Sequence, residues 1–446
     1  MEISIPEYIG KIIHRIEEAG FTAYLVGGCV RDFILGKPPV DYDLATSATP
    51  IQILTLFKDK KTVEIGSEYG TVIIVEGEGN VEVTTYRTEG TYVDGRRPEQ
   101  VSFTEDILED LRRRDFTINA MAYHPERGLL DPYDGIEDIR DNLVRCVGNP
   151  RERLSEDHLR ILRAVRFATQ LDFLIDIKTS EACMDLAPRL EKVSIDRIRE
   201  EFFKILLSKK PSRGFLLMRS LGILKEVIPE LIPAIGFDQR NPYHDRSVFQ
   251  HTLTVMDNTP PVLHVRLAAL LHDIGKPYTF TLDDKGVGHF YGHDKASVKI
   301  GKEILARLNC STDLTERTLM LVKEHMIHHP DLKKKGLKRQ LQRVGEDRIH
   351  DLIDLQVADR LSKRGNNDIS NLLAKKRAVE AILDAKEPFC RKHLALNGDD
   401  LKAMGYSEGK IIGKILEYLL NCVLEKPELN KRESLKKIAE DIYPLD

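Results

Sequence analysis

The sequence predicts an α+β protein, with an N-terminal portion built on a mostly antiparallel sheet and a remainder that is almost entirely helical. Short β-rich runs separated by glycine-rich turns occupy the first third of the chain. From about Ser155 onward, apolar residues recur at i, i+3 and i+4, the spacing of amphipathic helices. With 446 residues, the chain is long enough for about three domains that each bury a core.

The predicted elements follow one another in a simple order. Four strands are expected, at 23–26, 62–65, 71–75 and 81–86, with a turn at 76–80 joining the last two. The helical spacing is clearest in HLRILRAVRFATQLDF, DRIREEFFKILL, RLAALLHDIGK, GKEILARLN and GKIIGKILEYLLNCVLEK. Proline and glycine clusters predict four domains: a head at 1–148, a helical neck at 149–235, a third domain at 236–365 and a helical tail at 366–446.

Composition narrows the class of protein. The chain is 41% hydrophobic and 31% charged, which excludes collagen, coiled coil and wholesale disorder. With 67 basic and 71 acidic residues the formal net charge is −4, which leaves nucleic acid open as a partner because a polyanion needs only a basic face. The six cysteines form no C-x-x-C pair, and neither a signal peptide nor a membrane-spanning run is present. We therefore expect a cytoplasmic protein without membrane association.

A first group of candidate site residues lies in LVGGCVRDFILGKPPVDYDLAT. The pattern predicts a strand, a turn at Gly27 and Gly28, a short helix carrying Arg31, and a second strand with two aspartates. Glycines let backbone N–H groups approach a phosphate closely, and a following helix N-terminus adds positive potential. The turn is therefore a candidate cradle for a triphosphate.

Two aspartates and a glutamate form a candidate metal site. Asp41 and Asp43 are i and i+2 of a predicted strand, so their side chains are expected on one face. Glu82, in VEVTTYR, is a candidate third carboxylate from a neighbouring strand. One interpretation is a Mg²⁺ site for phosphoryl transfer, and the alternative is a solvated strand end.

The sequence GGCVRDFILG followed by DYDLAT resembles the signature of the bacterial tRNA nucleotidyltransferase and poly(A) polymerase family, within the DNA polymerase β-like nucleotidyltransferases. The resemblance implies that Asp41, Asp43 and Glu82 are catalytic and that the first two bind Mg²⁺. It also covers RRDFTINA, where it implies nucleotide contacts for Arg114, Asp115 and Asn119, and DPYDGIEDI, a hinge-like stretch between head and neck.

The segment EDHLR resembles the family element that selects the base. Asp157 and Arg160 are expected at i and i+3 on one helix face, where an ordinary ion pair is the alternative interpretation. Cytosine and adenine both present an exocyclic amine beside an unprotonated ring nitrogen. A carboxylate acceptor beside a guanidinium donor fits both bases and leaves uracil and guanine with unpaired polar groups. Arg163 and Arg166, further along the helix, are also assigned to nucleotide binding.

Two other segments match family motifs. TYVDGRRPEQVSF, at 91–103, resembles a loop that complete CCA-adding enzymes use for the final A; it includes Arg96 and Arg97. LEKVSIDRIREEF, at 190–202, resembles the motif that packs behind the base-selecting helix. We interpret its Arg197 and Glu201 as structural braces.

A second group of candidate residues is rich in histidine, since nine of the 14 histidines fall between His244 and His329. The order His251, His272-Asp273 and Asp359 resembles the metal-binding pattern of HD-superfamily phosphohydrolases. Imidazole and carboxylate ligands suit a divalent transition metal, which can supply a nucleophilic hydroxide. Candidates for a second metal or for phosphate contacts are His293, His325, His328 and His329. Lys276 is a candidate phosphate contact or helix cap.

The resemblance as a whole implies an enzyme that adds C, C and A to the 3′ end of tRNA from CTP and ATP, without a nucleic-acid template. It further implies a phosphohydrolase activity and a tail that contacts tRNA. An A-adding enzyme and a bacterial poly(A) polymerase share the head and neck motifs, although the latter would more often end in a basic extension. From a different class come an HD phosphohydrolase with an RNA-binding head and a non-enzymatic RNA-binding scaffold. The oligomeric state does not follow from the sequence.

Overall fold

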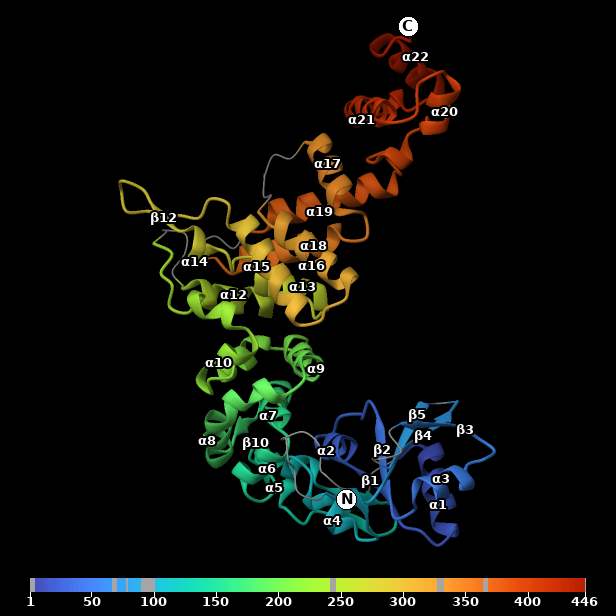
Figure 1. Ribbon diagram of the computed structural model, residues 1–446, viewed down its shortest axis with the longest axis vertical. Helices are drawn as coiled ribbons and strands as arrows, with labels where there is room; N and C mark the ends of the chain where they lie inside the picture. Colours follow the sequence, from blue (N-terminus) through green and yellow to red (C-terminus); the bar gives the residue numbers. More distant parts are fainter. Residues whose placement is uncertain are drawn as a thin grey trace. The chain divides into compact units, whose positions relative to one another are not determined.

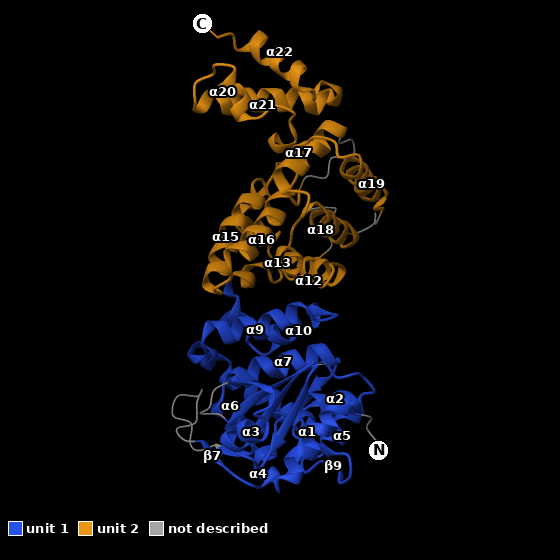
Figure 2. Cartoon of the chain, turned by 90° about the vertical axis from the view of Figure 1, so that its right-hand side faces the viewer, with its two compact units in different colours: residues 1–229 blue, residues 230–446 orange. Residues whose placement is uncertain are grey.

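The computed structural model describes residues 5–65, 70–77, 79–89, 101–240, 246–326, 333–363 and 368–445. The chain forms two compact units, residues 1–229 and 230–446 (Figure 2). The first unit therefore holds both the predicted head and the predicted neck, and the four-domain division stays a prediction. Among the described residues, no helix is long and apolar enough to cross a membrane.

The first unit is organised around a sheet of seven described strands in the order β3-β4-β5-β2-β1-β8-β9 (Figure 1). Within them β2 and β5 are parallel and the other neighbours are antiparallel, which confirms the predicted mostly antiparallel sheet. The strands are β1 (Ala23–Val26), β2 (Tyr42–Thr46), β3 (Lys61–Ile65), β4 (Thr71–Glu76), β5 (Gly79–Thr85), β8 (Ala122–His124) and β9 (Gly128–Leu130). The predicted turn at 76–80 joins β4 to β5.

Helices pack on the sheet through regular apolar stripes. Helix α1 (Glu7–Glu18) buries Ile9, Ile12, Ile13 and Ile16, the i, i+3, i+4, i+7 positions of one face. It packs against β1 and against α3 (Pro50–Leu56), whose N-terminus is closed by a Thr49–Gln52 capping box. The short helix α2 (Gly28–Ile34) follows directly on β1.

The helices after the sheet hold one difference from the sequence prediction. Asp157 and Arg160 do not share a helix, because α6 (Pro150–Glu156) ends before Asp157 and α7 begins at Leu159. The backbone of Asp157 is extended, and its Oδ1 accepts a hydrogen bond from the Leu159 N–H at 3.1 Å. An aspartate that binds a nearby backbone N–H favours a helix boundary over a helix interior. The prediction of one continuous face was therefore wrong.

Helices of the first unit also approach one another closely through small residues. The helices are α7 (Leu159–Leu171), α8 (Ile177–Leu186), α9 (Ile195–Leu206) and α10 (Pro211–Ser220). Gly214 in α10 faces both α7 and α9, so that a Cβ there would lie 2.9 Å from Thr169 Oγ1 and still closer to Ile205. The absence of a side chain at this position allows the three helices to pack.

The second unit is helical, as predicted. Its described helices of nine or more residues are α12 (Val248–Asn258), α13 (Leu263–Leu271), α15 (His293–Arg307), α16 (Thr312–Glu324), α17 (Lys334–Val344), α18 (Ile349–Leu361), α19 (Ser370–Asp384), α21 (Lys410–Glu425) and α22 (Arg432–Ile442). His272 and Asp273 lie just beyond the end of α13 and not within a helix, as the sequence had suggested. The helix ends there because the Gly275 N–H donates to Ser297 Oγ of α15 at 2.9 Å.

Gly214→Ala should destabilise the protein by about 1–3 kcal/mol, because overpacking outweighs the helix propensity of alanine. Gly413→Ala, in α21, is the matched control, since a Cβ there meets nothing within 4 Å. The control should be neutral or up to about 1 kcal/mol more stable. Urea denaturation followed by circular dichroism measures both changes. Equal stabilisation by the two substitutions would contradict the packing argument.

Candidate functional site

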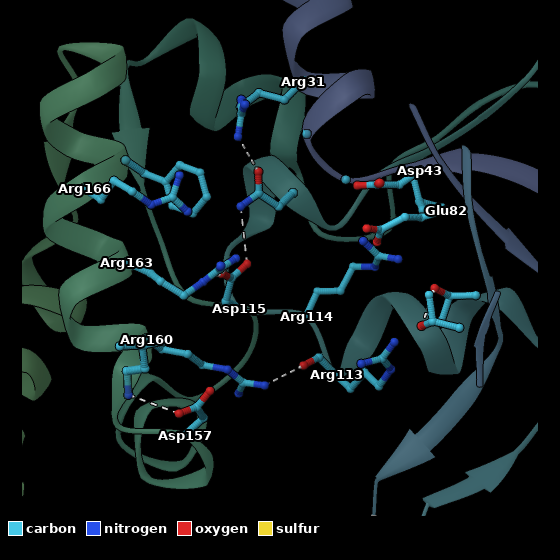
Figure 3. Close-up of a pocket in the computed structure, with 18 of the residues that line it drawn as sticks. Arg31, Asp43, Glu82, Arg113, Arg114, Asp115, Asp157, Arg160, Arg163 and Arg166 are labelled. Carbon is cyan, nitrogen blue, oxygen red and sulfur yellow. Dashed lines mark hydrogen bonds and ion pairs between the residues drawn. The ribbon is translucent and has the colours of Figure 1, made fainter. Parts of the chain in front are cut away.

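A cavity of about 600 Å³ in the first unit collects most of the residues proposed from the sequence (Figure 3). Those that line it are Gly27, Gly28, Arg31, Asp43, Glu82, Arg114, Asp115, Asn119, Asp157, Arg160, Arg163 and Arg166. Its described lining carries eight arginines against four acids, so the cavity is strongly positive. A site of this charge suits a polyanionic ligand.

The acids of the cavity meet on two neighbouring strands. Asp43 on β2 is directly opposite Glu82 on β5 in the parallel register. Burial raises the pKa of Asp43 to about 6, with Glu82 and Asp41 adding to the rise and Arg114 opposing it. Carboxylates crowded in this way favour a bound cation, so the donor set fits a divalent metal with oxygen preference.

Asp41 lies differently from the prediction. Strand β2 begins at Tyr42, and Asp41 is an exposed residue just before it, outside the described lining of the cavity. The expectation that Asp41 and Asp43 share one strand face was therefore wrong. Its charge still acts on Asp43, whose pKa it raises.

The glycine turn has a specific geometric reason. Gly27 adopts φ 73° and ψ −130°, a conformation that residues with a Cβ rarely occupy. A Cβ at this position would also lie 3.1 Å from Arg114 Nη1. Figure 3 shows Arg114 pointing toward Asp43 and Glu82, and Asp110 holds its guanidinium by an ion pair of 3.0 Å. The turn thus leaves room for an arginine beside the carboxylates.

A chain of hydrogen bonds crosses the cavity. Arg31 Nη1 donates to Asn119 Oδ1 at 2.8 Å, Asn119 Nδ2 donates to Asp115 Oδ1 at 3.3 Å, and Arg163 Nε donates to Asp115 Oδ2 at 2.7 Å (Figure 3). Burial alone would raise the pKa of Asp115, but Arg163 and Arg160 lower it to about 2. The chain fixes the side chains of α2 relative to those of α7.

Arginine side chains also surround one aromatic ring that the sequence interpretation missed. The guanidinium carbons of Arg31, Arg163 and Arg166 lie 5.3, 5.4 and 3.9 Å from the centre of the Phe167 ring. Cation–π contacts of this kind stabilise and orient guanidinium groups. The helical spacing of Arg163, Phe167 and Arg166 was visible in the sequence, but the contact with Arg31 depends on the fold.

The two proposed base-selecting residues both line the cavity but have separate partners. Asp157 accepts two hydrogen bonds from Arg197, at 3.1 and 2.6 Å. Arg160 is 8% exposed and donates to the carbonyls of Arg153 and Arg113 at 2.8 and 3.1 Å, with an ion pair to Glu156. The alternative interpretation, an ion pair between Asp157 and Arg160 themselves, is not what these bonds show.

The second unit brings the proposed histidines and aspartates together in a buried cluster around Asp273. His251 Nε2 lies 3.1 Å from Asp359 Oδ1 and 3.5 Å from Asp273 Oδ2, and His272 Nε2 lies 3.2 Å from the same Oδ2. On its other side, Asp273 Oδ1 lies 3.4 Å from His293 Nε2 and 3.8 Å from His325 Nε2. Two groups of potential metal ligands therefore share one carboxylate.

Hydrogen bonds prepare three of these histidines for a metal. Nδ1 of His272, His293 and His325 lies 2.8, 2.8 and 2.6 Å from the carbonyls of Ala269, Phe290 and Val322. Because a carbonyl only accepts, each Nδ1 carries the proton and each Nε2 keeps its lone pair toward Asp273. Burial lowers the pKa of His325 to about 3, with His272 adding to the effect. The neutral imidazoles fit a metal centre.

Lysines balance the two acids of this cluster. Lys276 Nζ lies 2.8 Å from Asp273 Oδ2, and Lys363 Nζ lies 2.8 Å from Asp359 Oδ2. Burial would raise the pKa of Asp273, but His272 and Lys276 hold it well below its ordinary value. Lys276 is thus placed at the ligand set. His244, His328 and His329, and Arg96 and Arg97 of the loop at 91–103, lie outside the described residues.

Comparison with known proteins agrees with both sites. Three family models match: the poly A polymerase head domain at 23–145, the probable RNA and SrmB-binding site of polymerase A at 172–235, and the HD domain at 244–364. The solved structure of the Bacillus stearothermophilus CCA-adding enzyme in complex with CTP is similar with a TM-score of 0.73 and 26% identity, covering 98% of each chain.

Relatives of known name are also similar in sequence. The CCA-adding enzyme of Pediococcus pentosaceus is 46% identical over 252 residues, a match that spans 56% of this chain and only 61% of that enzyme. The CCA-adding enzyme of Lactiplantibacillus plantarum is 34% identical over 436 residues, which cover 96% of this chain and 94% of that relative. The chain therefore belongs to the CCA-adding enzyme family of nucleotidyltransferases and carries an HD domain.

Proposed function

We propose that the first unit adds C, C and A to the 3′ end of tRNA, using CTP and ATP and no nucleic-acid template. The observation that carries this proposal is the meeting of the Asp43–Glu82 pair with eight arginines in one cavity. Carboxylates that favour a cation and guanidinium groups that favour a polyphosphate are the two requirements of nucleotidyl transfer. The same chemistry would serve an A-adding enzyme or a poly(A) polymerase, which the first experiment below separates.

Each residue has a proposed part in the reaction. Asp43 and Glu82, with Asp41 close by, would hold Mg²⁺, which activates the attacking hydroxyl and balances the charge of the leaving pyrophosphate. The turn at Gly27 and Gly28 would receive the triphosphate. Arg31 and Arg114 would bind phosphate oxygens, and the buried Asp115 and Asn119 would contact the nucleotide and keep Arg31 and Arg163 in place.

Base selection would rest on Asp157 and Arg160. The carboxylate would accept a hydrogen bond from the exocyclic amine of cytosine or adenine, and the guanidinium would donate to the adjacent ring nitrogen. Uracil and guanine present a carbonyl and a ring N–H instead, so they would leave buried donors and acceptors unpaired. Arg163 and Arg166, which stack on Phe167, would add positive potential at the nucleotide.

We propose that the second unit hydrolyses phosphate esters. His251, His272, Asp273 and Asp359 would hold a divalent transition metal, and His293 and His325 a second ion that shares Asp273. A metal at this site would supply a hydroxide nucleophile at neutral pH. Lys276, bonded to Asp273 and to Gln239 Oε1 at 3.0 Å, is placed to bind a substrate phosphate. We expect the protein to act in the cytoplasm, where tRNA is processed.

The first experiment follows extension of tRNA lacking its 3′ end, and of tRNA ending in CC, on a gel with single-nucleotide resolution. Purified protein and Mg²⁺ are supplied with each nucleoside triphosphate alone and with all four. We expect C, C and A in that order, followed by a stop. Addition of A to only the CC-ended tRNA would identify an A-adding enzyme, and a long ladder of A would identify a poly(A) polymerase.

The two proposed metal sites should be separable by substitution. Asp43→Asn should lower nucleotide addition by at least about 1000-fold, because it removes a metal ligand at the reacting phosphate. It should leave hydrolysis of a 2′,3′-cyclic nucleotide unchanged. Asp273→Asn should abolish that hydrolysis, assayed with Mn²⁺ or Ni²⁺, and leave addition intact. Loss of both activities in either variant would contradict the assignment of one reaction to each unit.

Arg160→Ala should relax the choice of nucleotide. We expect the ratio of kcat/KM for CTP to that for UTP to fall by about 10- to 100-fold, since a lost hydrogen bond removes most of the penalty on the wrong base. Single-turnover incorporation on one tRNA measures the ratio, and thermal unfolding checks that the variant folds. Unchanged rejection of UTP and GTP in a folded variant would rule out base selection by Arg160.

A further inference from the structure

The contact between Asp157 and Arg197 defines how the proposed base-selecting carboxylate is held. Arg197 Nη1 donates to Oδ1 at 3.1 Å and Nη2 donates to Oδ2 at 2.6 Å, the two-point geometry of a guanidinium on a carboxylate. The Leu159 N–H also donates to Oδ1, at 3.1 Å. Among the described residues, Oδ1 thus receives two hydrogen bonds and Oδ2 receives one.

This count leaves a single acceptor position on the carboxylate. An ionised carboxylate offers about four lone-pair sites, two on each oxygen. Three are used by Arg197 and Leu159, so the remaining one belongs to Oδ2. One acceptor matches one N–H of an exocyclic amine. The orientation of that acceptor depends on Arg197, because the backbone at Asp157 is extended and lies between two helices.

The position of Arg197 is itself fixed by a second ion pair from the same helix. Arg197 and Glu201 are one turn apart on α9, and Glu201 accepts a hydrogen bond from Arg166 Nε on α7. Glu201 is 3% exposed, and α9 packs along α7. Two oppositely directed ion pairs therefore set the place of α9 relative to the cavity. The second pair contributes no group to Asp157, so the two roles can be tested apart.

We propose that Arg197 is the positioning residue of base selection, because it orients Asp157 so that one acceptor on Oδ2 is available to the amine of cytosine or adenine. The inference rests on the proposed function, in which Asp157 and Arg160 select the base. It goes beyond the sequence interpretation, which took Arg197 as a brace without chemistry. Loss of Arg197 would free Asp157 to rotate, with the guanidinium of Arg160 in the same cavity as a new partner.

The test compares four variants of the full chain: Arg197→Ala, Arg197→Lys, Asp157→Ala and the double variant Asp157→Ala/Arg197→Ala. Arg199→Ala is the matched control, since Arg199 lies on the same helix and pairs with Asp196 at 2.8 Å, away from the described lining of the cavity. For each variant, the ratio of kcat/KM for CTP to that for UTP is measured on tRNA lacking its 3′ end. Thermal unfolding is recorded in parallel.

We expect Arg197→Ala to lower this ratio by at least tenfold and Arg199→Ala to leave it unchanged. The double variant should discriminate no worse than Asp157→Ala alone, because both substitutions remove one function. Arg197→Lys should fall between, since an ammonium group cannot make the two-point contact. The lysine variant also decides the question if the alanine variant does not fold.

A purely structural role would lower thermal stability or kcat for all nucleotides and leave the ratio unchanged. An unchanged ratio in both Arg197 variants, with a lowered ratio in Asp157→Ala, would overturn the inference about Arg197 alone. An unchanged ratio in Asp157→Ala would overturn the proposed base selection, and the inference with it.

Discussion

Charge compensation around the cavity is the constraint on which the first unit depends. Eight guanidinium groups gathered in one cavity repel one another and lose hydration, so each needs an acid that is fixed in place. Asp110 holds Arg113 and Arg114, Asp115 holds Arg163, and Glu201 holds Arg166. These acids come from different helices and loops, so correct packing of those elements is required before the arginines can share the space. The positive character of the site and the stability of the fold are consequences of the same ion pairs.

The two units present different solutions to holding a cation. In the first unit the donors are carboxylate oxygens on strands, a set that suits Mg²⁺. In the second unit they are imidazole nitrogens whose other nitrogen is bonded to a backbone carbonyl, a set that suits a transition metal. The donor chemistry thus separates the two proposed reactions within a single chain, and it requires no shared ion.

Much of the fold and of the cavity could be predicted because the responsible signals are local. Strand and helix periodicity, the glycine turn and the short motifs led to the antiparallel-rich sheet and to most of the lining residues. Asp41 and Asp157 were placed wrongly, since each lies one residue outside a regular element and its side chain or backbone decides where that element ends. Arg197 and Phe167 gained their roles from contacts over long sequence separations. Arg197 meets Asp157, and Phe167 meets Arg31, only after α7 and α9 have packed.

The parallel pairing of β2 with β5 has a consequence for how the carboxylates are spaced. Adjacent strands in a sheet lie about 4.8 Å apart, a distance set by the backbone hydrogen bonds. Asp43 and Glu82 stand opposite one another on this ladder, so their separation is independent of the chain that connects them. The intervening segment contains α3 and the β3–β4 hairpin. Insertions or deletions there can accumulate through evolution, or be engineered, without altering the ruler that spaces the two carboxylates.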